Sequence, residues 1–212
     1  MVGRLCCFSI AGILCGLAVV SASLAAGTDY WYEILNKVPA QTNDNATVPT
    51  YKYPYHVGLW LTCYDQDIPD TIPNKELISG NCVLNYDFRS KQIEDFARTS
   101  AVCIVLSCGI MLASGVLGMS GCACRRSTPL LLSGIFLYAS TLVMLIGMCC
   151  FIGRILLEGE PPNIPVAADV TTRYGWSFYL GWASVGLQLL SASMMVGGNR
   201  KCSGIKDQVN FI

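Results

Sequence analysis

The apolar residues of the chain gather in four long runs, separated by stretches that carry nearly all of its charged residues. The runs cover residues 5–27, 100–121, 129–152 and 175–198. Each is long enough to cross a hydrocarbon core about 30 Å thick, which takes about 20 helical residues. The pattern predicts one four-span membrane domain over residues 1–212, with loops at 28–99 and 153–174 and a tail at 199–212.

The composition agrees with a membrane protein and narrows the range of possible functions. The chain is 53% hydrophobic and 13% charged, and its formal net charge is zero. It has no basic block that would bind nucleic acid, so we expect membrane lipid and other membrane proteins as partners. Because the four runs contain no Asp, Glu, Lys, Arg or His, the sequence offers no intramembrane proton relay or ion ligand. A carrier or pump is therefore not predicted.

The first run admits a second interpretation, as a cleaved signal peptide. Arg4 precedes it, and small residues at positions 23–25 resemble a cleavage site. Its apolar part is longer than the core of a typical signal peptide, so an uncleaved span is the preferred interpretation.

Basic residues near the ends of the runs predict the orientation. By the positive-inside rule, segments rich in Lys and Arg face the cytoplasm. Basic residues occur before the first run, between the second and third, and after the fourth: Arg4, Arg125, Arg126, Arg200, Lys201 and Lys206. Both termini are thus expected in the cytoplasm of a plasma-membrane protein, and residues 28–99 and 153–174 outside the cell.

Of the 12 cysteines, only Cys63 and Cys82 fall in the predicted outer loops. Because disulfides persist on the oxidising side of a membrane, we expect these two to be bonded, although two free thiols are the alternative. Cys6, Cys7, Cys122, Cys124 and Cys202 lie at the predicted cytoplasmic face, where palmitoylation and simple packing are both open. Cys122 and Cys124 lack a second ligand pair for zinc, and no metal or cofactor is expected.

The long outer loop has the composition of a small antiparallel sheet. Residues 30–35, 57–64 and 83–88 are rich in aromatic and β-branched residues, whereas Pro and Gly interrupt the intervening sequence. A disulfide would hold such strands together, with Trp31 and Trp60 buried against the sheet or at the membrane interface. Asn45 begins the sequon Asn-Ala-Thr in the same loop, so a glycan is expected there.

The order of these residues resembles a known signature. Trp31, then Gly58, Leu59 and Trp60, then Cys63 and Cys82 resemble the W…GLW…C…C pattern of the superfamily of claudins, peripheral myelin protein, epithelial membrane proteins and calcium-channel gamma subunits. Arg98 resembles the Arg that many members carry before the second span. The resemblance covers nearly the whole chain. It implies a claudin-like fold, a four-helix bundle with an extracellular antiparallel sheet, that depends on these residues.

The branch within the superfamily is left open. The gaps from Trp31 to Gly58 and from Cys63 to Cys82 are longer than in typical claudins, so claudin pore residues do not transfer directly. The C-terminal Ile212 resembles the end of a PDZ ligand, but Asn210 occupies a position where such ligands carry another residue type. PDZ binding is accordingly an open alternative.

An enzyme is not predicted. The single histidine, His56, has no nucleophile beside it, and the acids of the outer loop are scattered rather than paired. The leading prediction is a claudin-like structural protein of cell contacts that adheres or forms a paracellular barrier, as a homo-oligomer or with neighbouring membrane proteins. The alternative is an auxiliary subunit of an ion channel or receptor.

Overall fold

The computed structural model describes residues 2–36, 55–64, 77–79, 82–84, 91–123, 127–158 and 170–209. These residues form two compact units. The bundle unit comprises Met1–Ala26, Val102–Met148 and Leu180–Ile212, and the sheet unit comprises Gly27–Ala101 and Cys149–Tyr179. Each unit thus combines segments that lie far apart in the sequence.

Four long helices account for the four apolar runs. They are α1 (Val2–Gly27), α2 (Lys91–Ala123), α3 (Ser127–Glu158) and α4 (Trp176–Val209). Each contains a stretch long and apolar enough to cross a membrane: Ser9–Gly27, Lys91–Cys122, Thr128–Leu157 and Trp176–Gly198. The protein is a multi-pass membrane protein, and α2 begins earlier and α3 ends later than the apolar runs alone indicated. Pro129 fits in α3 because it lies in the first turn, where its missing N–H is not needed.

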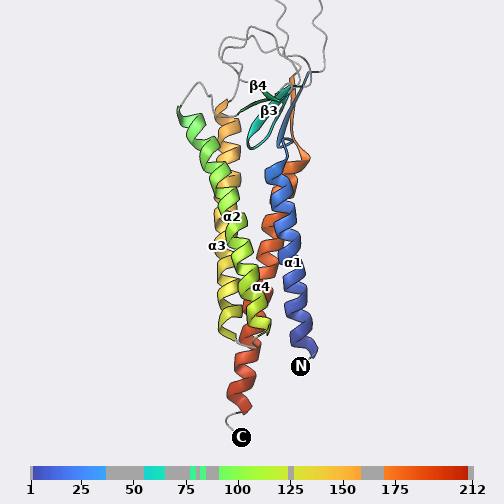
Figure 1. Ribbon diagram of the computed structural model, residues 1–212, viewed down its shortest axis with the longest axis vertical. Coiled ribbons are helices and arrows are strands. Elements are labelled where there is room, and N and C mark those ends of the chain that lie inside the picture. Colours follow the sequence, from blue (N-terminus) through green and yellow to red (C-terminus); the bar gives the residue numbers. More distant parts are fainter. Residues whose placement is uncertain are drawn as a thin grey trace, which may run out of the picture. The chain divides into compact units, whose positions relative to one another are not determined.

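Within the bundle unit, the helices run alongside one another, as Figure 1 shows. Buried residues recur every seven positions, which is the spacing of a left-handed helix bundle. On α1 they are Ala11 and Ala18, and on α3 they are Leu130, Leu137 and Met144, all of them at most 1% exposed. Small residues on α1 let a neighbouring backbone approach closely, as is usual between membrane helices.

The glycines of the bundle unit divide into two groups. A Cβ at Gly118 or Gly121 would meet side-chain atoms of α3 within 3.1 Å, so these two glycines allow α2 and α3 to pack closely. Gly12 and Gly16 are different, because no described atom lies within 4 Å of a Cβ placed there. The spacing of these two predicts packing inside the bundle, and among the described residues that packing does not occur. Both glycines face outward.

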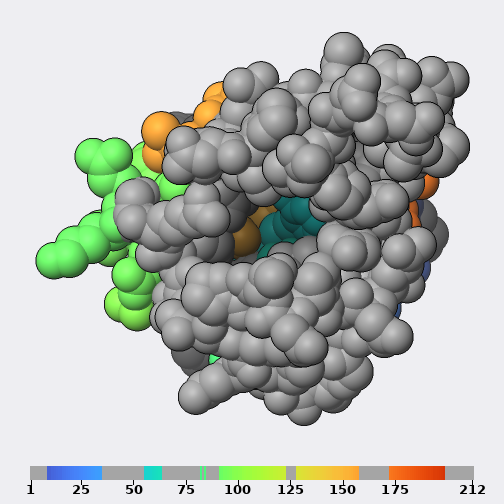
Figure 2. Space-filling view, turned by 90° about the horizontal axis from the view of Figure 1, so that it is seen from above, coloured from blue at the N-terminus to red at the C-terminus, as the bar shows by residue number. Residues whose placement is uncertain are grey.

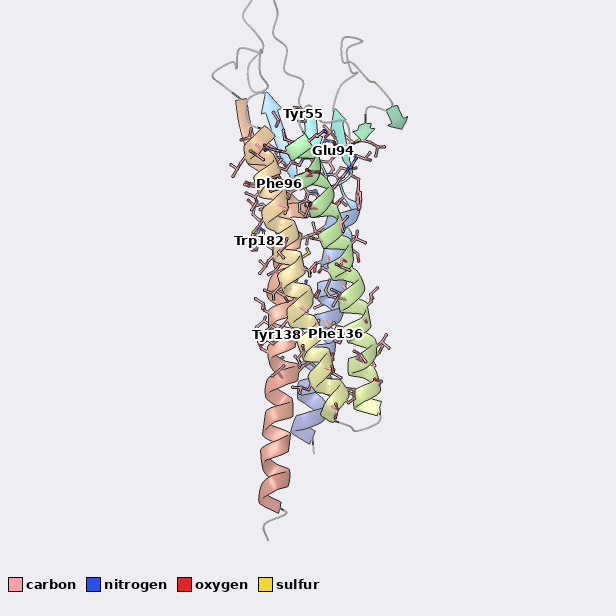
Figure 3. The ribbon with its side chains drawn as sticks, turned by 90° about the vertical axis from the view of Figure 1, so that its left-hand side faces the viewer. Tyr55, Glu94, Phe96, Phe136, Tyr138 and Trp182 are labelled. Carbon is pink, nitrogen blue, oxygen red and sulfur yellow. A yellow bond between two sulfur atoms is a disulfide. The ribbon has the colours of Figure 1, made fainter. Side chains whose placement is uncertain are left out.

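The outward surface of the bundle unit is otherwise formed by large apolar side chains. Phe136 and Tyr138 of α3 are 40% and 38% exposed, and Figure 3 shows both on this helix. The Tyr138 hydroxyl lies 2.9 Å from the Ser193 hydroxyl of α4, so its polar group is satisfied within the protein. A surface of this kind is suited to lipid tails or to helices of another membrane protein.

A chain of hydrogen bonds crosses the interior of the bundle unit and touches all four helices. The Ser107 hydroxyl of α2 lies 3.1 Å from the Ser140 hydroxyl of α3, which donates to Gln188 Oε1 of α4 at 3.0 Å. Gln188 Nε2 donates to Ser184 Oγ at 3.1 Å, and the Ser184 hydroxyl donates to the Ala18 carbonyl of α1 at 2.9 Å. Gln188 is the centre of this network, and it is fully buried.

We expect Gln188→Leu to destabilise the bundle unit by about 1–3 kcal/mol, because it leaves the hydroxyls of Ser140 and Ser184 buried without the amide. Unfolding of the purified protein in mixed detergent micelles measures the change. Ser120→Ala is the control, since Ser120 is exposed and its hydroxyl donates to the Leu117 carbonyl of its own helix, so its loss is expected to change stability by less than about 0.5 kcal/mol. If the two variants were equally stable, the hydrogen-bond network would not contribute the expected stability.

The sheet unit contains a six-stranded antiparallel sheet in the order β4-β5-β3-β2-β1-β6. Its strands are β1 (Tyr32–Asn36), β2 (Tyr55–Val57), β3 (Leu61–Tyr64), β4 (Leu77–Ser79), β5 (Cys82–Leu84) and β6 (Val170–Tyr174). Together with the four apolar helices, this sheet confirms the claudin-like fold class. The strand expected over residues 57–64 is wrong as a single element, because the chain turns at Gly58 and forms two paired strands, β2 and β3.

A strand from the second loop completes the sheet, and the sequence analysis did not predict it. β6 pairs with β1 over five residue pairs, from Tyr32 opposite Tyr174 to Asn36 opposite Val170. In the middle of this pairing, Arg173 Nε and Nη2 each lie 2.6 Å from Glu33 Oε2. Strands from both loops therefore belong to one sheet.

Candidate functional site: the motif residues of the sheet unit

Trp31 is the centre of the sheet unit. Its side chain is fully buried, and its ring centroid lies 4.8 Å from that of Phe151 on α3 and 6.3 Å from that of Phe178 on α4. Phe178 in turn stacks on Tyr174 of β6 at 4.3 Å. Tilted and stacked aromatic pairs at such distances add to the free energy gained by burial alone. This aromatic cluster joins β6 to α3, α4 and the start of the first loop.

The backbone around Trp31 is held on both sides. Its N–H donates to the Val57 carbonyl at 3.1 Å, and its carbonyl accepts from the Gly175 N–H at 3.0 Å. Tyr30 is fixed in the same way, because its carbonyl accepts from the Ser177 N–H at 3.1 Å. The segment that leaves α1 is thereby fastened to β2 and to the first turn of α4.

Two glycines make this close approach possible. A Cβ on Gly58 would lie 2.5 Å from the Asp29 Cα, and a Cβ on Gly175 would collide with the Tyr30 carbonyl oxygen. Both obstacles are backbone atoms, which cannot rotate away as a side chain can. Gly58 also donates its N–H to the Leu61 carbonyl at 2.7 Å, closing the turn between β2 and β3. This turn buries Leu59, which is 2% exposed.

We expect Gly58→Ala and Gly175→Ala each to destabilise the sheet unit by about 1–3 kcal/mol or more, because the added methyl group forces two backbone segments apart. Thermal unfolding of the purified protein and its amount at the cell surface are the measurements. Gly186→Ala is the matched control, since no described atom lies within 4 Å of a Cβ placed there. If all three variants behaved alike, close backbone approach would not explain the motif glycine.

The predicted disulfide is confirmed. Cys63 and Cys82 are bonded, and they lie directly opposite each other in the pairing of β3 with β5. Cys63 is buried at 5% exposure. The bond fixes β5 to β3, the strand that follows the turn containing Gly58 and Leu59.

Arg98 lies on α2 and forms an ion pair with Glu94 one turn earlier on the same helix. Its side chain is 59% exposed, and exposed pairs at this spacing contribute about 0.3–0.5 kcal/mol. Trp60 is half-buried in the turn between β2 and β3. The expectation that the fold depends on Arg98 stays a prediction.

Arg154 is a residue that the sequence analysis missed. It lies on α3 three residues after Phe151, and it is 1% exposed. Charged side chains are almost never buried in this way unless they have partners, and a buried arginine at a membrane boundary marks a position with a structural or functional role. The third apolar run ends at residue 152, so Arg154 falls in the predicted loop.

The exposed edge of the Trp31 region is aromatic and weakly charged. The rings of Tyr30 and His56 stack with centroids 4.3 Å apart. At the start of α4, the ring centroid of Trp176 lies 6.1 Å from that of Tyr30. Burial raises the pKa of the Asp29 carboxyl, and His56 partly offsets this shift. Among the described residues, no three His, Cys, Asp or Glu side chains form a group that could hold a metal ion.

Several predicted modification sites lie outside the described residues. They are Asn45 and Cys124, together with the side chains of Cys6, Cys7 and Cys202. Cys122 is described, and it is an exposed free cysteine at the end of α2. Its acylation stays a prediction, as does the glycan on Asn45.

The chain is similar to known membrane proteins. Voltage-dependent calcium channel gamma-6 subunit of Rattus norvegicus is 29% identical over 201 residues, covering 82% of this chain and 72% of the relative. Voltage-dependent calcium channel gamma-7 subunit of Homo sapiens is 27% identical over 177 residues, covering 77% of this chain and 58% of the relative. A family model described as PMP-22/EMP/MP20/Claudin tight junction matches residues 14–197. With the bonded cysteines and the buried tryptophan in place, this match shows that the chain belongs to the PMP-22/EMP/MP20/claudin family.

Proposed function

We propose that the protein is a non-enzymatic auxiliary subunit of a voltage-dependent calcium channel. The observation that carries the proposal is the similarity to gamma subunits of two types, each over more than three quarters of this chain. The fold supports it, because a bundle with a lipid-facing apolar surface can lie beside the helices of a channel. Exposed side chains such as Val102, Val116 and Met119 of α2, each more than 60% exposed, belong to that surface.

We also infer that the sheet unit faces the cell exterior and that both termini are cytoplasmic. The Cys63–Cys82 bond favours this orientation, because such bonds form and persist in oxidising compartments. The positions of the basic residues favour the same orientation. The sheet would then contact the outer surface of the channel.

Co-expression with the pore-forming subunit of a voltage-dependent calcium channel tests the proposal. We expect the two proteins to co-purify and the voltage dependence or amplitude of the calcium current to change. A protein that reaches the surface but neither co-purifies with the channel nor alters its current would contradict the proposal.

A second candidate function is adhesion or barrier formation at cell contacts. It is favoured by the family description, which includes claudins of the tight junction. Expression in epithelial cells that lack claudins separates the two candidates. Enrichment at cell borders with altered transepithelial resistance would favour the junction, whereas a diffuse surface signal with unchanged resistance would favour the channel subunit.

A further inference from the structure

A row of side chains crosses the sheet unit on one face of its sheet. The residues lie directly opposite one another on neighbouring strands, and they are Cys82 on β5, Cys63 on β3, His56 on β2, Glu33 on β1 and Arg173 on β6. Because directly opposed residues of antiparallel strands share a face of the sheet, their side chains are neighbours. The row ends in a disulfide on one side and in an ion pair on the other.

The charged groups of the row have an excess of negative charge. The Glu33 side chain is only 14% exposed, and Arg173 Nε and Nη2 both contact its Oε2 atom. The other oxygen, Oε1, lies on the side of Gly175, 3.4 Å from the position of a Cβ on that glycine. Asp29 supplies a second carboxylate. Burial raises the pKa of the Asp29 carboxyl and His56 lowers it, so these two groups are close enough to interact. With a neutral imidazole, two carboxylates therefore face one guanidinium.

His56 is the member of the row whose charge changes near neutral pH. It is the only histidine of the chain, and histidine is the side chain that ordinarily changes charge between about pH 5 and pH 8. Its strand neighbours are Glu33 and the bonded Cys63, and its ring stacks on Tyr30, beside which α4 places the uncharged Trp176. His56 is half-buried, and Figure 2 shows teal atoms of the segment that contains β2 and β3 from above. Water can therefore reach this segment.

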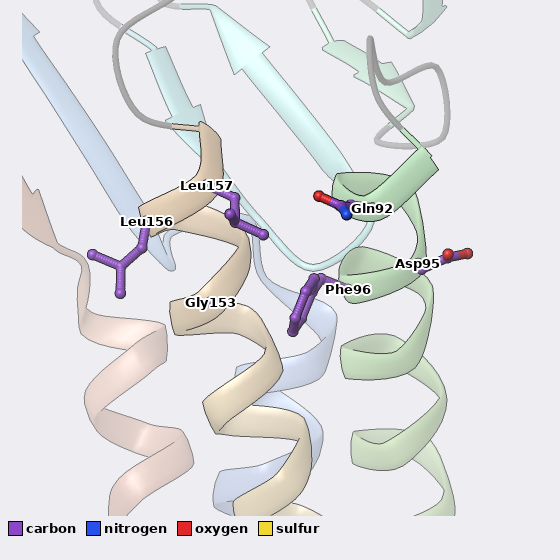
Figure 4. Close-up of a pocket in the computed structure, with 6 residues that line it drawn as sticks. All are labelled: Gln92, Asp95, Phe96, Gly153, Leu156 and Leu157. Atoms are coloured by element: carbon purple, nitrogen blue, oxygen red, sulfur yellow. The ribbon is translucent and has the colours of Figure 1, made fainter.

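The acids at the start of α2 lie outside the row. Glu94 pairs with Arg98 on the same helix, and Figure 4 shows Asp95 on the side of α2 that is turned away from α3. Neither acid belongs to a strand of the sheet. Asp95 therefore provides a matched control for the removal of a carboxylate from the sheet unit.

We propose that His56 is an acid sensor, and that a proton on its imidazole supplies a second cation to Glu33 and fastens β2 to β1 and β6. The charged ring is then directly opposite the Glu33 carboxylate, with the Asp29 carboxylate also nearby. Opposite charges at opposed positions stabilise strand pairing, and a carboxylate can accept hydrogen bonds from more than one donor. The imidazole is uncharged in neutral solution. The attraction is therefore present in acid and lost as the pH rises.

The proton also changes the charge that the sheet presents to a partner. In acid, the two cations His56 and Arg173 balance the two carboxylates of Asp29 and Glu33, whereas at neutral pH one negative charge is left over. A protein that binds this face of the sheet is therefore expected to bind in a pH-dependent way. That the sensor responds to the fluid outside the cell rests on the orientation inferred above, but the response of the sheet itself does not.

Hydrogen exchange of the purified full-length protein in detergent micelles tests the proposal. The amides of β1 and β6 are followed by mass spectrometry at about pH 5.5 and about pH 7.5, on either side of the usual histidine titration. Each variant is compared with the wild-type protein at the same pH, which removes the intrinsic pH dependence of exchange. We expect these amides to exchange about threefold faster in His56→Gln than in the wild-type protein in acid, and equally fast at the higher pH.

Further variants separate the charge of His56 from its packing. His56→Phe keeps a ring against Tyr30 without a charge, so it should behave as His56→Gln does. In a Glu33→Gln background, His56→Gln should have no further effect, whereas Asp95→Asn should keep the wild-type response. Equal exchange in acid of the wild-type protein and both His56 variants, or a His56 effect that persists without the Glu33 carboxylate, would overturn the proposal. The test uses the isolated protein, so its outcome is independent of channel binding.

Discussion

Replacing Trp31 with alanine should unfold the sheet unit or bring it close to unfolding. The side chain is fully buried against Phe151 and Phe178, and truncating a buried aromatic residue costs about 3–5 kcal/mol. Because the free energy of unfolding of a whole domain is only about 5–15 kcal/mol, a loss of this size removes a large share of it. Thermal unfolding of the purified protein and its amount at the cell surface are the measurements.

Trp176→Ala is the matched control. It is a tryptophan of the same unit, but it is 49% exposed, and its ring lies beside Tyr30 at the surface. We expect this variant to lose less than about 1 kcal/mol and to reach the surface normally. Trp31→Phe should recover part of the lost stability, because it keeps an aromatic ring. Equal defects in Trp31→Ala and Trp176→Ala would show that burial is not the reason for the motif tryptophan.

Much of the fold follows from local sequence signals. A run of about 20 apolar residues has few structures other than a membrane helix, so the four helices could be predicted from composition alone. The disulfide could be predicted because Cys63 and Cys82 are the only cysteines outside the apolar runs and their margins. Both inferences needed no knowledge of which segments lie together in space.

Features that depend on long-range contact could not be predicted in this way. Residues 57–64 read as one strand, but the chain turns at Gly58, whose N–H donates to the Leu61 carbonyl and whose backbone passes close to that of Asp29. β6 has the sequence Val-Thr-Thr-Arg-Tyr, whose β-branched and aromatic residues favour a strand, but only its pairing with β1 shows which sheet it joins. Arg154 was assigned to a loop for a similar reason, since only the folded protein shows it to be buried. For residues 57–64 and for Arg154, tertiary contact overrides the local signal.

The motif residues explain the fold better than they explain the function. Trp31, Leu59 and Cys63 are all at most 5% exposed, and Gly58 is required by backbone approach. Side chains in such positions cannot contact a partner protein. A family defined by this motif therefore shares a scaffold, while partner choice depends on exposed loops and helix faces. This is why family membership leaves both a channel subunit and a junction protein as candidates.

Removing the disulfide should destabilise the sheet unit by about 3 kcal/mol, the value expected for closing a loop of this length in the unfolded chain. The bond spans 19 residues and joins β3 to β5. We expect Cys63→Ser, Cys82→Ser and the double variant to lose similar amounts of stability and of surface expression. Thermal unfolding with and without a reducing agent measures the effect.

Reduction separates the bond from the side chains that form it. If the bond is the source of stability, a reducing agent lowers the unfolding temperature of the wild-type protein to that of the double variant and leaves the double variant unchanged. Cys149→Ser is the control, because Cys149 is an exposed free cysteine and is not among the cysteines predicted to be acylated. It should retain the stability of the wild-type protein and its sensitivity to reduction. A double variant as stable as the wild-type protein would mean that strand pairing and the buried Trp31 cluster hold the sheet without the bond.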